Sequence, residues 1–417
     1  MIERHLIKLI EQSLKRFPAV LLIGARQVGK STLAEQLIQH GLLDYYVSLD
    51  DLNHLEAARG DPDGFLASFG SRVAIDEVQH VPDLMRALKF SIDKKRQNGR
   101  YLLTGSANIL AYPRVKESLA GRVDVIYLEG LSLGEQLRQP KSSTLLSDLF
   151  SYQTSEKFIT HCRQRMKMIP KLTLQMIFKA IFYGGFPSIV LTNDPYFNAR
   201  WFSAYQTTYL ERDVRDIGKL VDIIPFTKLL RLITLRTSNL LVNANLAKDV
   251  GIDQRTIVRY LGMLELTFQC HRLMPWHANI NKRLIKTPKI FCNDSGFACY
   301  FFGISDIQQL HTSPFLGALA ETWLWSEFRK LLIFHPEIHS SFYRTYAGRE
   351  IDFVLNRGNQ YVGIEFKFAR TVSSNDFAGL KDMQSEVDNM LGVVLYTGDQ
   401  LAAFSDKLIA VPLNLIL

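Results

Sequence analysis

Two acidic residues and a lysine near the end of the sequence have the spacing expected of a metal-dependent phosphodiesterase site. Asp352 lies in REIDFVLN, and Glu365 and Lys367 lie in YVGIEFKFA; both stretches alternate apolar and polar residues on either side of a Gly-containing turn. Two carboxylates on adjacent strands bind Mg²⁺, because its preferred ligands are oxygen atoms. The metal lowers the pKa of a bound water. Lys367, on the same face as Glu365, can orient that water or stabilise the oxyanion.

The pairing of the two predicted strands decides whether these side chains meet. Alternation places the apolar residues on one face of each strand, namely Ile351, Phe353 and Leu355, and then Val362, Ile364, Phe366 and Phe368. The charged residues of the other face are Glu350, Asp352, Glu365 and Lys367. If Phe353 faces Ile364, Asp352 lies opposite Glu365 or one diagonal away. A solvated polar face is the alternative, and Glu350 is expected to be a solvated bystander.

A second group of residues, close to the N-terminus, has the pattern of a phosphate-binding loop. The stretch GARQVGKS, residues 24–31, fits G-x-x-x-x-G-K-[ST] between a short apolar strand and an amphipathic helix. Glycines let successive backbone N–H groups converge on phosphate oxygens at a helix N-terminus. Lys30 would reach the β- and γ-phosphates, and Ser31 would ligate Mg²⁺. The expected binding residues for ATP and Mg²⁺ are therefore Gly24, Gly29, Lys30, Ser31 and Thr32.

Later strands should end beside this loop and complete the nucleotide site. SRVAIDE ends in Asp76, which would hold the hydrated Mg²⁺, and Glu77, which would polarise the attacking water. Ligands sit at the carboxyl ends of parallel strands, which agrees with this placement. RYLLTGS ends in Ser106, which either senses the γ-phosphate or caps the next helix. Arg122 would stabilise transition-state charge in its own chain or in a neighbouring subunit, or form a surface salt bridge.

The order of these motifs resembles a known group of proteins. IDEVQ, LLTGSAN, ESLAGR and LSLGE look like the AAA-type ATPases of bacteria and archaea whose C-terminal half is a domain of unknown function. The likeness continues through FYGGFPSIV (182–190), TYLERDV (208–214) and KIFCNDSGFACYFFG (289–303), so it covers nearly the whole chain. It implies ATP binding and hydrolysis. Residues 138–172 match nothing in this group, and their role is open.

Residues 243–270 predict a helix, a tight turn and a second helix. Gly251 permits the turn and Asp253 can cap the second helix. Arg255 and Arg259 lie one turn apart on a face that would enter a DNA groove or grip phosphates. The basic residues that follow are Lys282, Arg283, Lys286 and Lys289. Packing against protein is the alternative, since many helix-turn-helix units do only that.

The charge distribution favours DNA as a partner. The net charge is +8, and the stretch from Pro225 to Ile290 carries all of it, with eleven basic and three acidic residues. A concentrated positive region suits a polyanion. A solvated helical surface is the alternative explanation.

The C-terminal order of elements resembles the PD-(D/E)xK nuclease core of restriction enzymes and Holliday-junction resolvases. The residues from 315 onward predict the order α-β-β-β-α-β, with Glu321 in the first helix. The resemblance implies that Glu321 is the helical acid, Asp352 the first metal ligand, and Glu365 and Lys367 the E-x-K pair. Cleavage does not follow from the fold alone, because function rests on the site.

Composition excludes several other classes of protein. The chain is 47% apolar and 22% charged, and no apolar run approaches the roughly 18 residues that span a bilayer. The N-terminal residues lack the pattern of a signal peptide, and we expect a cytoplasmic protein. The four cysteines form no CxxC pair, which favours buried thiols in a reducing compartment.

The sequence therefore predicts an α/β chain of four units. These are an AAA-type P-loop NTPase core (1–135), a helical lid or linker (136–220), a basic winged helix-turn-helix (221–300) and a restriction-endonuclease-like domain (301–417). The expected function is ATP-dependent DNA processing with Mg²⁺-dependent cleavage. No membrane partner is expected, and the protein could form a homo-oligomer. The alternatives are a nucleotide-switched DNA- or protein-binding regulator that does not cut, and a protein-remodelling ATPase.

Overall fold

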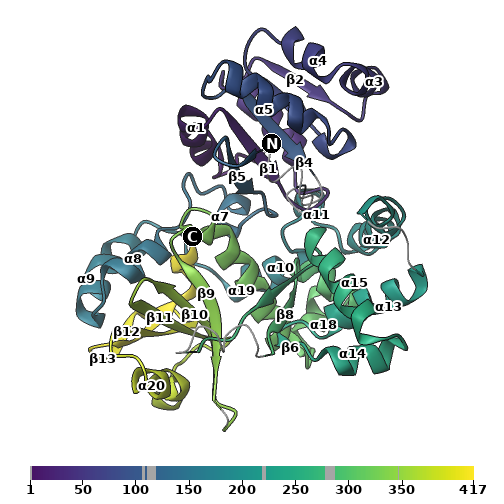
Figure 1. Ribbon diagram of the computed structural model, residues 1–417. Coiled ribbons are helices and arrows are strands. Elements are labelled where there is room, and N and C mark those ends of the chain that lie inside the picture. Colours follow the sequence, from purple (N-terminus) through teal and green to yellow (C-terminus); the bar gives the residue numbers. More distant parts are fainter. Residues whose placement is uncertain (1, 106–108, 110–118, 218–221, 278–286, 346) are drawn as a thin grey trace.

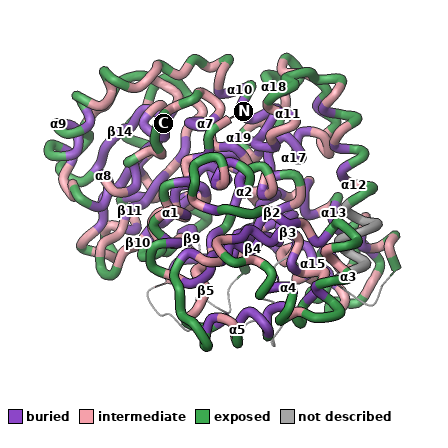
Figure 2. The backbone as a smooth tube through the Cα atoms, turned by 90° about the horizontal axis from the view of Figure 1, so that it is seen from above, coloured by how far each residue is buried: buried purple, intermediate pink, exposed green. Residues whose placement is uncertain are grey.

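The computed structural model describes residues 2–105, 109, 119–217, 222–277, 287–345 and 347–417, without the side chains of residues 209–217. An N-terminal α/β unit occupies the top of Figure 1, a second sheet lies at lower left, and a largely helical region lies at lower right. Seen from above in Figure 2, buried backbone runs along β3 and β4 in the N-terminal unit. These parts pack through one extended apolar core.

The N-terminal unit is a five-stranded parallel sheet in the order β2-β3-β4-β1-β5. Its strands are β1 (Ala19–Ile23), β2 (Tyr45–Ser48), β3 (Val73–Asp76), β4 (Tyr101–Gly105) and β5 (Val123–Tyr127). The helices around it are α1 (Ile7–Arg16), α2 (Lys30–Gln39), α3 (Leu52–Gly60), α4 (Pro62–Ser68) and α5 (Leu84–Lys94), with a short 3₁₀ turn η1 (Val78–His80). Every residue of β1, β3 and β4 is buried, as expected of parallel strands covered on both faces.

The segment whose role the sequence left open packs against the C-terminal sheet. After α7 (Leu133–Gln136), the chain forms α8 (Leu145–Ser151) and α9 (Ser155–Met166). Arg165 Nη2 donates to the carbonyls of Leu415 at 2.8 Å and Leu417 at 2.7 Å. The N–H of Ser155 donates to the carbonyl of Asp406 at 2.8 Å. Helices α8 and α9 therefore pack against the C-terminal unit, and the lid or linker at 136–220 stays a prediction.

The middle of the chain is helical with one small sheet. Its helices are α10 (Leu174–Tyr183), α11 (Pro187–Thr192), α12 (Pro195–Ile217), α13 (Ile223–Leu235), α14 (Asn243–Val250), α15 (Gln254–Leu266), α17 (Ser295–Phe301) and α18 (Ile307–Thr312). The antiparallel strands β6 (Asn239–Leu240), β8 (Lys289–Cys292) and β7 (Cys270–Leu273) pair in that order. Gly251 ends α14 with a φ of 86°, and the Asp253 carboxylate caps α15 by accepting from the N–H of Thr256 at 3.0 Å. The predicted helix, turn and helix are confirmed.

The C-terminal unit is a six-stranded mixed sheet in the order β13-β14-β12-β11-β10-β9. Its elements are α19 (Leu316–Leu332), β9 (His339–Arg344), β10 (Glu350–Arg357), β11 (Gln360–Lys367), η3 (Ser374–Phe377), α20 (Ala378–Gln384), β12 (Met390–Tyr396), β13 (Ala402–Ser405), β14 (Leu408–Pro412) and η4 (Leu413–Ile416). The predicted α-β-β-β-α-β order is confirmed from α19 to β12, as is the pairing of Phe353 with Ile364.

One detail of strand β10 differs from simple alternation. Its pairing with β9 shifts between Ile351 and Val354, which is a β-bulge. The extra residue places Ile351 and Val354 in one apolar cluster, whereas Phe353 and Leu355 face the main core. The prediction that Ile351 shares a face with Phe353 is therefore wrong.

Two expectations from composition can be compared with the structure. All four cysteines are free and buried, as predicted. Among the described residues, no helix is long and apolar enough to cross a membrane.

Candidate functional site

The phosphate-binding loop curls at the carboxyl end of β1. Gly29 adopts a left-handed φ of 95° immediately before α2. A Cβ atom on Gly24 would lie 2.1 Å from the carbonyl oxygen of Leu128, so only glycine fits there. The Lys30 side chain is buried, and its Nζ donates to the carbonyls of Gly24 at 3.1 Å and Ala25 at 3.0 Å. The loop thus holds the ammonium group where phosphate oxygens would converge.

Asp76 gathers hydroxyl groups at the end of β3. Ser31 Oγ donates to Asp76 Oδ2 at 2.7 Å, Tyr46 OH donates to the same oxygen at 2.6 Å, and Thr104 Oγ1 donates to Oδ1. The structure therefore brings together Ser31 and Asp76, the predicted Mg²⁺ pair. A lysine, converging N–H groups, a hydroxyl and a carboxylate fit a Mg²⁺–nucleotide complex.

Tyr46 was missed by sequence reasoning. It lies on β2, which pairs with β3, and its side chain crosses to Asp76. Burial, and then the hydrogen bond to Asp76, raises the pKa of Tyr46, so the phenol remains a donor. Only the pairing of β2 with β3 could have indicated this contact, because nothing in the local pattern of YYVS marks it.

Glu77 stands beside Asp76 in an unusual backbone conformation. Its φ is 58°, in the left-handed region that non-glycine residues rarely adopt. Its carboxylate accepts a hydrogen bond from Gln79 Nε2, and its N–H donates to Thr104 Oγ1 at 3.4 Å. Thr32 is exposed on α2. Ser106 lies outside the described residues.

Arg122 lies at the amino ends of the parallel strands, and the phosphate loop lies at their carboxyl ends. Parallel pairing of Ala19 with Val123 places Arg122 beside the start of β1, whereas the phosphate loop follows its end. From Ala19, which pairs with Val123, to Ile23, which precedes the loop, β1 rises four residues, or about 13 Å at roughly 3.3 Å each. Arg122 Nε and Nη2 donate to the two carboxylate oxygens of Asp93, at 2.7 and 2.8 Å. This position favours action on the nucleotide of a neighbouring subunit over action in the same chain, and both roles stay predictions.

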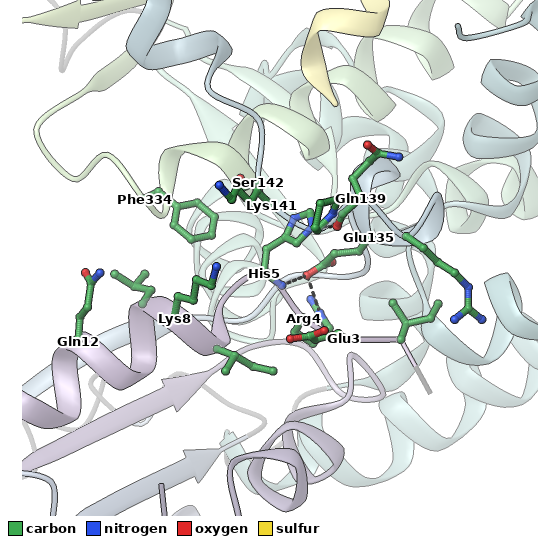
Figure 3. Close-up of a pocket in the computed structure, with 15 residues that line it drawn as sticks. Glu3, Arg4, His5, Lys8, Gln12, Glu135, Gln139, Lys141, Ser142 and Phe334 are labelled. Atoms are coloured by element: carbon green, nitrogen blue, oxygen red, sulfur yellow. Dashed lines mark hydrogen bonds and ion pairs between the residues drawn. The ribbon is translucent and has the colours of Figure 1, made fainter. Parts of the chain in front are cut away.

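A cavity of 620 Å³ lies between α1, residues 138–142 and Phe334 (Figure 3). Arg4 lines it and forms a buried ion pair with Glu135, with 3.0 Å between Nε and Oε1. The same guanidinium donates to the carbonyls of Val28 at 2.9 Å and Glu129 at 2.7 Å. Arg4, which the sequence did not single out, thus ties the N-terminal segment to the phosphate loop and to the chain after β5. None of residues 24–32, all of which are described, lines this cavity.

The predicted DNA-binding face of α15 is open to solvent. Ile257, Leu261 and Leu264 are buried, whereas Arg255 and Arg259 are exposed. Within the described part of the chain, neither arginine has an ion-pair partner. Lys282 and Arg283 lie outside the described residues.

Several other basic residues of this region are already neutralised. Arg236 pairs with Asp249, Arg272 pairs with Glu265, and Lys289 is buried. The exposed basic residues that remain in the described part of 225–290 are Lys228, Arg231, Lys248, Arg255 and Arg259. The available positive surface is therefore smaller than the charge count suggested.

The D…E-x-K residues meet at the bulged part of β10. Asp352 Oδ2 accepts a hydrogen bond from the N–H of Phe366 at 2.8 Å, so its side chain reaches across to β11. Lys367 Nζ donates to Glu365 Oε1 at 2.8 Å. The pairing of Phe353 with Ile364 places Asp352 beside Glu365 of the next strand, and the bulge lies at the same point of β10.

The side chain of Lys289 lies among these acidic residues, a position that the sequence did not predict. Lys289 Nζ lies 2.8 Å from Glu321 Oε1 and 3.9 Å from Asp352 Oδ1, and it also pairs with Glu350. Ser238 Oγ donates to the other oxygen of Glu321. Glu350 is therefore part of this cluster, and its prediction as a solvated bystander is wrong. We call Glu321, Glu350, Asp352 and Glu365 the acidic cluster.

The acidic cluster carries more acid than base. Burial, followed by repulsion from Asp352, raises the pKa of Glu321 to about 7 and that of Glu365 to about 8. Burial also raises the pKa of Asp352, and the surrounding carboxylates raise that of Lys289 despite its burial. Among the described residues, no three Asp, Glu, His or Cys side chains converge closely enough to hold a metal ion. The ammonium group of Lys289 is the cation that Glu321, Glu350 and Asp352 contact in this arrangement.

Comparison with known proteins places the phosphate loop in a recognised domain type. Residues 16–137 match the family model described as an AAA domain. Residues 174–308 and 316–416 match two domains of unknown function, DUF8612 and DUF4143. This match, together with the geometry of the loop, supports an AAA-type P-loop domain that binds ATP, and a match to a domain of unknown function follows it in the C-terminal part.

Two relatives extend over nearly the whole chain. The uncharacterized proteins Mb2031c of Mycobacterium bovis and Rv2008c of Mycobacterium tuberculosis are each 29% identical over 412 residues, which is 98% of this chain and 83% of theirs. Among solved structures, a variant of Thermotoga maritima RuvB is 17% identical, with a TM-score of 0.31 over 65% of this chain and 90% of that one. The S. cerevisiae Hsp104–ADP complex is 14% identical, with a TM-score of 0.30 over 80% and 43%. These scores are too low to bear on the fold.

The ATPase domain is bonded directly to α19. Arg329 of α19 forms an ion pair with Glu129, and both side chains are largely buried. Arg329 Nη1 also donates to Asn293 Oδ1 at 2.8 Å. Two further bonds join Lys330 Nζ to the carbonyl of Leu131 at 3.0 Å and the N–H of Leu133 to Glu327 Oε2 at 2.9 Å.

Two of the motifs quoted from the sequence meet at the same junction. The N–H of Gly185 donates to Asp294 Oδ2 at 2.7 Å, and the N–H of Leu131 donates to the carbonyl of Gly185 at 2.6 Å. A Cβ on Gly184 would lie 2.2 Å from Asp294 Oδ1. FYGGFPSIV and KIFCNDSGF therefore fasten the middle of the chain to the ATPase domain.

Proposed function

We propose that this protein is an ATP-hydrolysing DNA-binding switch, in which the ATPase domain controls a winged helix-turn-helix. The observation that carries the proposal is the exposed pair Arg255 and Arg259 on α15, whose opposite face is buried. The order α13, β6, α14, α15, β7, β8 supports the winged form of this motif. Arginines one turn apart suit phosphate or base contacts.

The test is DNA binding measured by fluorescence anisotropy at several salt concentrations. The double variant Arg255→Ala/Arg259→Ala should bind duplex DNA about 10-fold more weakly, and its salt slope should fall by about 1 for each phosphate contact removed. Arg163→Ala is the matched control, because Arg163 is exposed on α9 over the C-terminal sheet. Equal affinities and slopes for all three proteins would refute the proposal. DNA affinity measured with and without ATP, for wild type and for Lys30→Ala, tests whether ATP binding changes the affinity for DNA.

A second function, Mg²⁺-dependent DNA cleavage by a PD-(D/E)xK-like domain, is favoured by the meeting of Asp352 with the strand that carries Glu365 and Lys367. Purified protein with ATP and Mg²⁺ or Mn²⁺ would be incubated with linear, branched and single-stranded DNA. Cleavage that is lost in Glu365→Ala while ATP hydrolysis survives would support it. No cleavage of any of these DNA forms would rule it out.

We also propose that Arg122 assists hydrolysis across subunits of a homo-oligomer. Its distance from its own phosphate loop supports action in trans. Lys30→Ala and Arg122→Ala proteins should each be inactive alone and regain ATPase activity when mixed, since one supplies the arginine and the other the intact loop. A mixture no more active than the sum of its parts would contradict this.

A further inference from the structure

Lys289 is a buried cation shared by three carboxylates. Its side chain is 3% exposed, and its ammonium group contacts Glu321, Glu350 and Asp352. Buried lysines are rare unless they are paired, because an isolated ammonium loses its hydration. The ammonium group therefore stands among the oxygens that the sequence assigned to a metal ion.

This lysine comes from a different part of the chain than the acids. Lys289 begins β8 and pairs in register with Leu240 of β6 and Leu273 of β7. Ser238, which precedes β6, also donates to Glu321. The small sheet of the middle region thus supplies two polar groups to a cluster built on α19 and β10.

The charge balance shows what the lysine does there. Four carboxyls, Glu321, Glu350, Asp352 and Glu365, face three cations, Lys289, Lys367 and Arg344, so the fully ionised cluster would carry four minus three, or one, negative charge. Without Lys289 the excess would rise to two. A divalent ion among the same oxygens would lie beside the ammonium and be repelled by it.

We infer that Lys289 is the resident cation of the acidic cluster and that it excludes a divalent metal ion for as long as its ammonium group stays there. The ligand class is a hard divalent cation such as Mg²⁺ or Mn²⁺, which oxygen ligands prefer. The inference rests on the second proposed function, because it concerns the metal that cleavage would need.

The test is Mn²⁺ binding by the full, nucleotide-free chain, measured by isothermal titration calorimetry. Lys289→Met should bind Mn²⁺ about 10- to 100-fold more tightly than wild type, since removing one close positive charge favours the divalent ion. The gain should disappear in Lys289→Met/Glu365→Gln. Lys289→Arg is the matched control, because it keeps the charge and should keep the metal out. ATPase rate and circular dichroism establish that each variant is folded, and Lys289→Gln replaces Lys289→Met if the latter does not fold.

Each outcome decides between the inference and the function on which it rests. A wild type that already binds Mn²⁺ through Glu365 as tightly as Lys289→Met would overturn the inference and leave the cleavage function standing. Folded neutral variants that bind no Mn²⁺ through the acidic cluster would overturn both. Tight binding in Lys289→Arg would also overturn the inference, because the charge would then not be what excludes the metal.

Discussion

Replacing Arg329 by methionine should loosen the attachment of the ATPase domain to α19. Arg329 pairs with Glu129, and the two side chains are 14% and 8% exposed. Methionine fills a similar volume without the charge, so Glu129 would keep a buried carboxylate with no cation. Asn293 would lose one donor to its Oδ1.

The magnitude follows from what each change leaves behind. Removing one partner of a buried ion pair costs about 3–5 kcal/mol. Removing both charges, in Glu129→Gln/Arg329→Met, should leave mainly the lost bond to Asn293, which costs about 1–3 kcal/mol. The double variant should therefore be more stable at this interface than the single one, by about 2 kcal/mol.

Amide hydrogen exchange is the suitable assay, because a chain of several domains need not unfold in two states. Amides of β5 and of the last turn of α19 should exchange about 100- to 4,000-fold faster in Arg329→Met, at 1.4 kcal/mol for each factor of ten. Arg72→Met is the matched control, because Arg72 pairs with Asp44 at 41% and 33% exposure; exposed pairs contribute only about 0–1 kcal/mol. Equal effects of the two single variants, or no recovery in the double variant, would refute this reasoning.

Three further predictions concern the ATPase loop and the acidic cluster. Gly24→Ala should abolish ATP binding in calorimetry, because its Cβ would lie 2.1 Å from the carbonyl of Leu128, whereas Gly60→Ala, with no atom within 4 Å, should bind normally. Lys30→Ala should lower the ATPase turnover by about 100-fold or more, because a charge that stabilises the transferring phosphate is lost. The pKa of Glu365 is raised from 4.5 to about 8, so the folded state holds a proton that the unfolded state releases. Its contribution to stability is present below pH 4.5 and is lost as the pH rises to about 8; in urea denaturation, Glu365→Gln should show a flatter pH dependence than wild type over this window.

The features that could be predicted from sequence are those that short segments encode. The phosphate loop needs particular residues at fixed offsets between one strand and one helix, so its pattern is visible without the fold. The turn at Gly251 and the cap at Asp253 follow from the same kind of local chemistry. The pairing of Phe353 with Ile364 was predictable because a hairpin has few registers that bury one face.

The features that could not be predicted depend on contacts between distant segments. Lys289 reads as one more basic residue in a basic stretch, and only the packing of β8 against α19 makes it the partner of Glu321. Arg4 acts on residues more than a hundred positions away. The bulge in β10 leaves no mark in the alternation of apolar residues, yet it places Ile351 on the same side of the sheet as Val354. The sequence does not show that Lys289 is buried, because other lysines of the same basic stretch are exposed.

Helix α19 joins the two candidate sites through a single rigid element. Arg329 near its end binds the ATPase domain, and Glu321, eight residues earlier, belongs to the acidic cluster. Eight residues of α-helix span about 12 Å. A movement of Glu129 relative to the C-terminal sheet must therefore either break its pair with Arg329 or carry α19 along, and α19 cannot move without displacing Glu321 from Lys289. Breaking the buried pair would cost about 3–5 kcal/mol, and helix shifts of about 1–2 Å are a common form of conformational change, so a movement that keeps the pair would carry α19 with it. The same reasoning makes hydrogen exchange at α19 in the Arg329→Met variant a measure of how firmly the nucleotide end of the molecule is coupled to the acidic end.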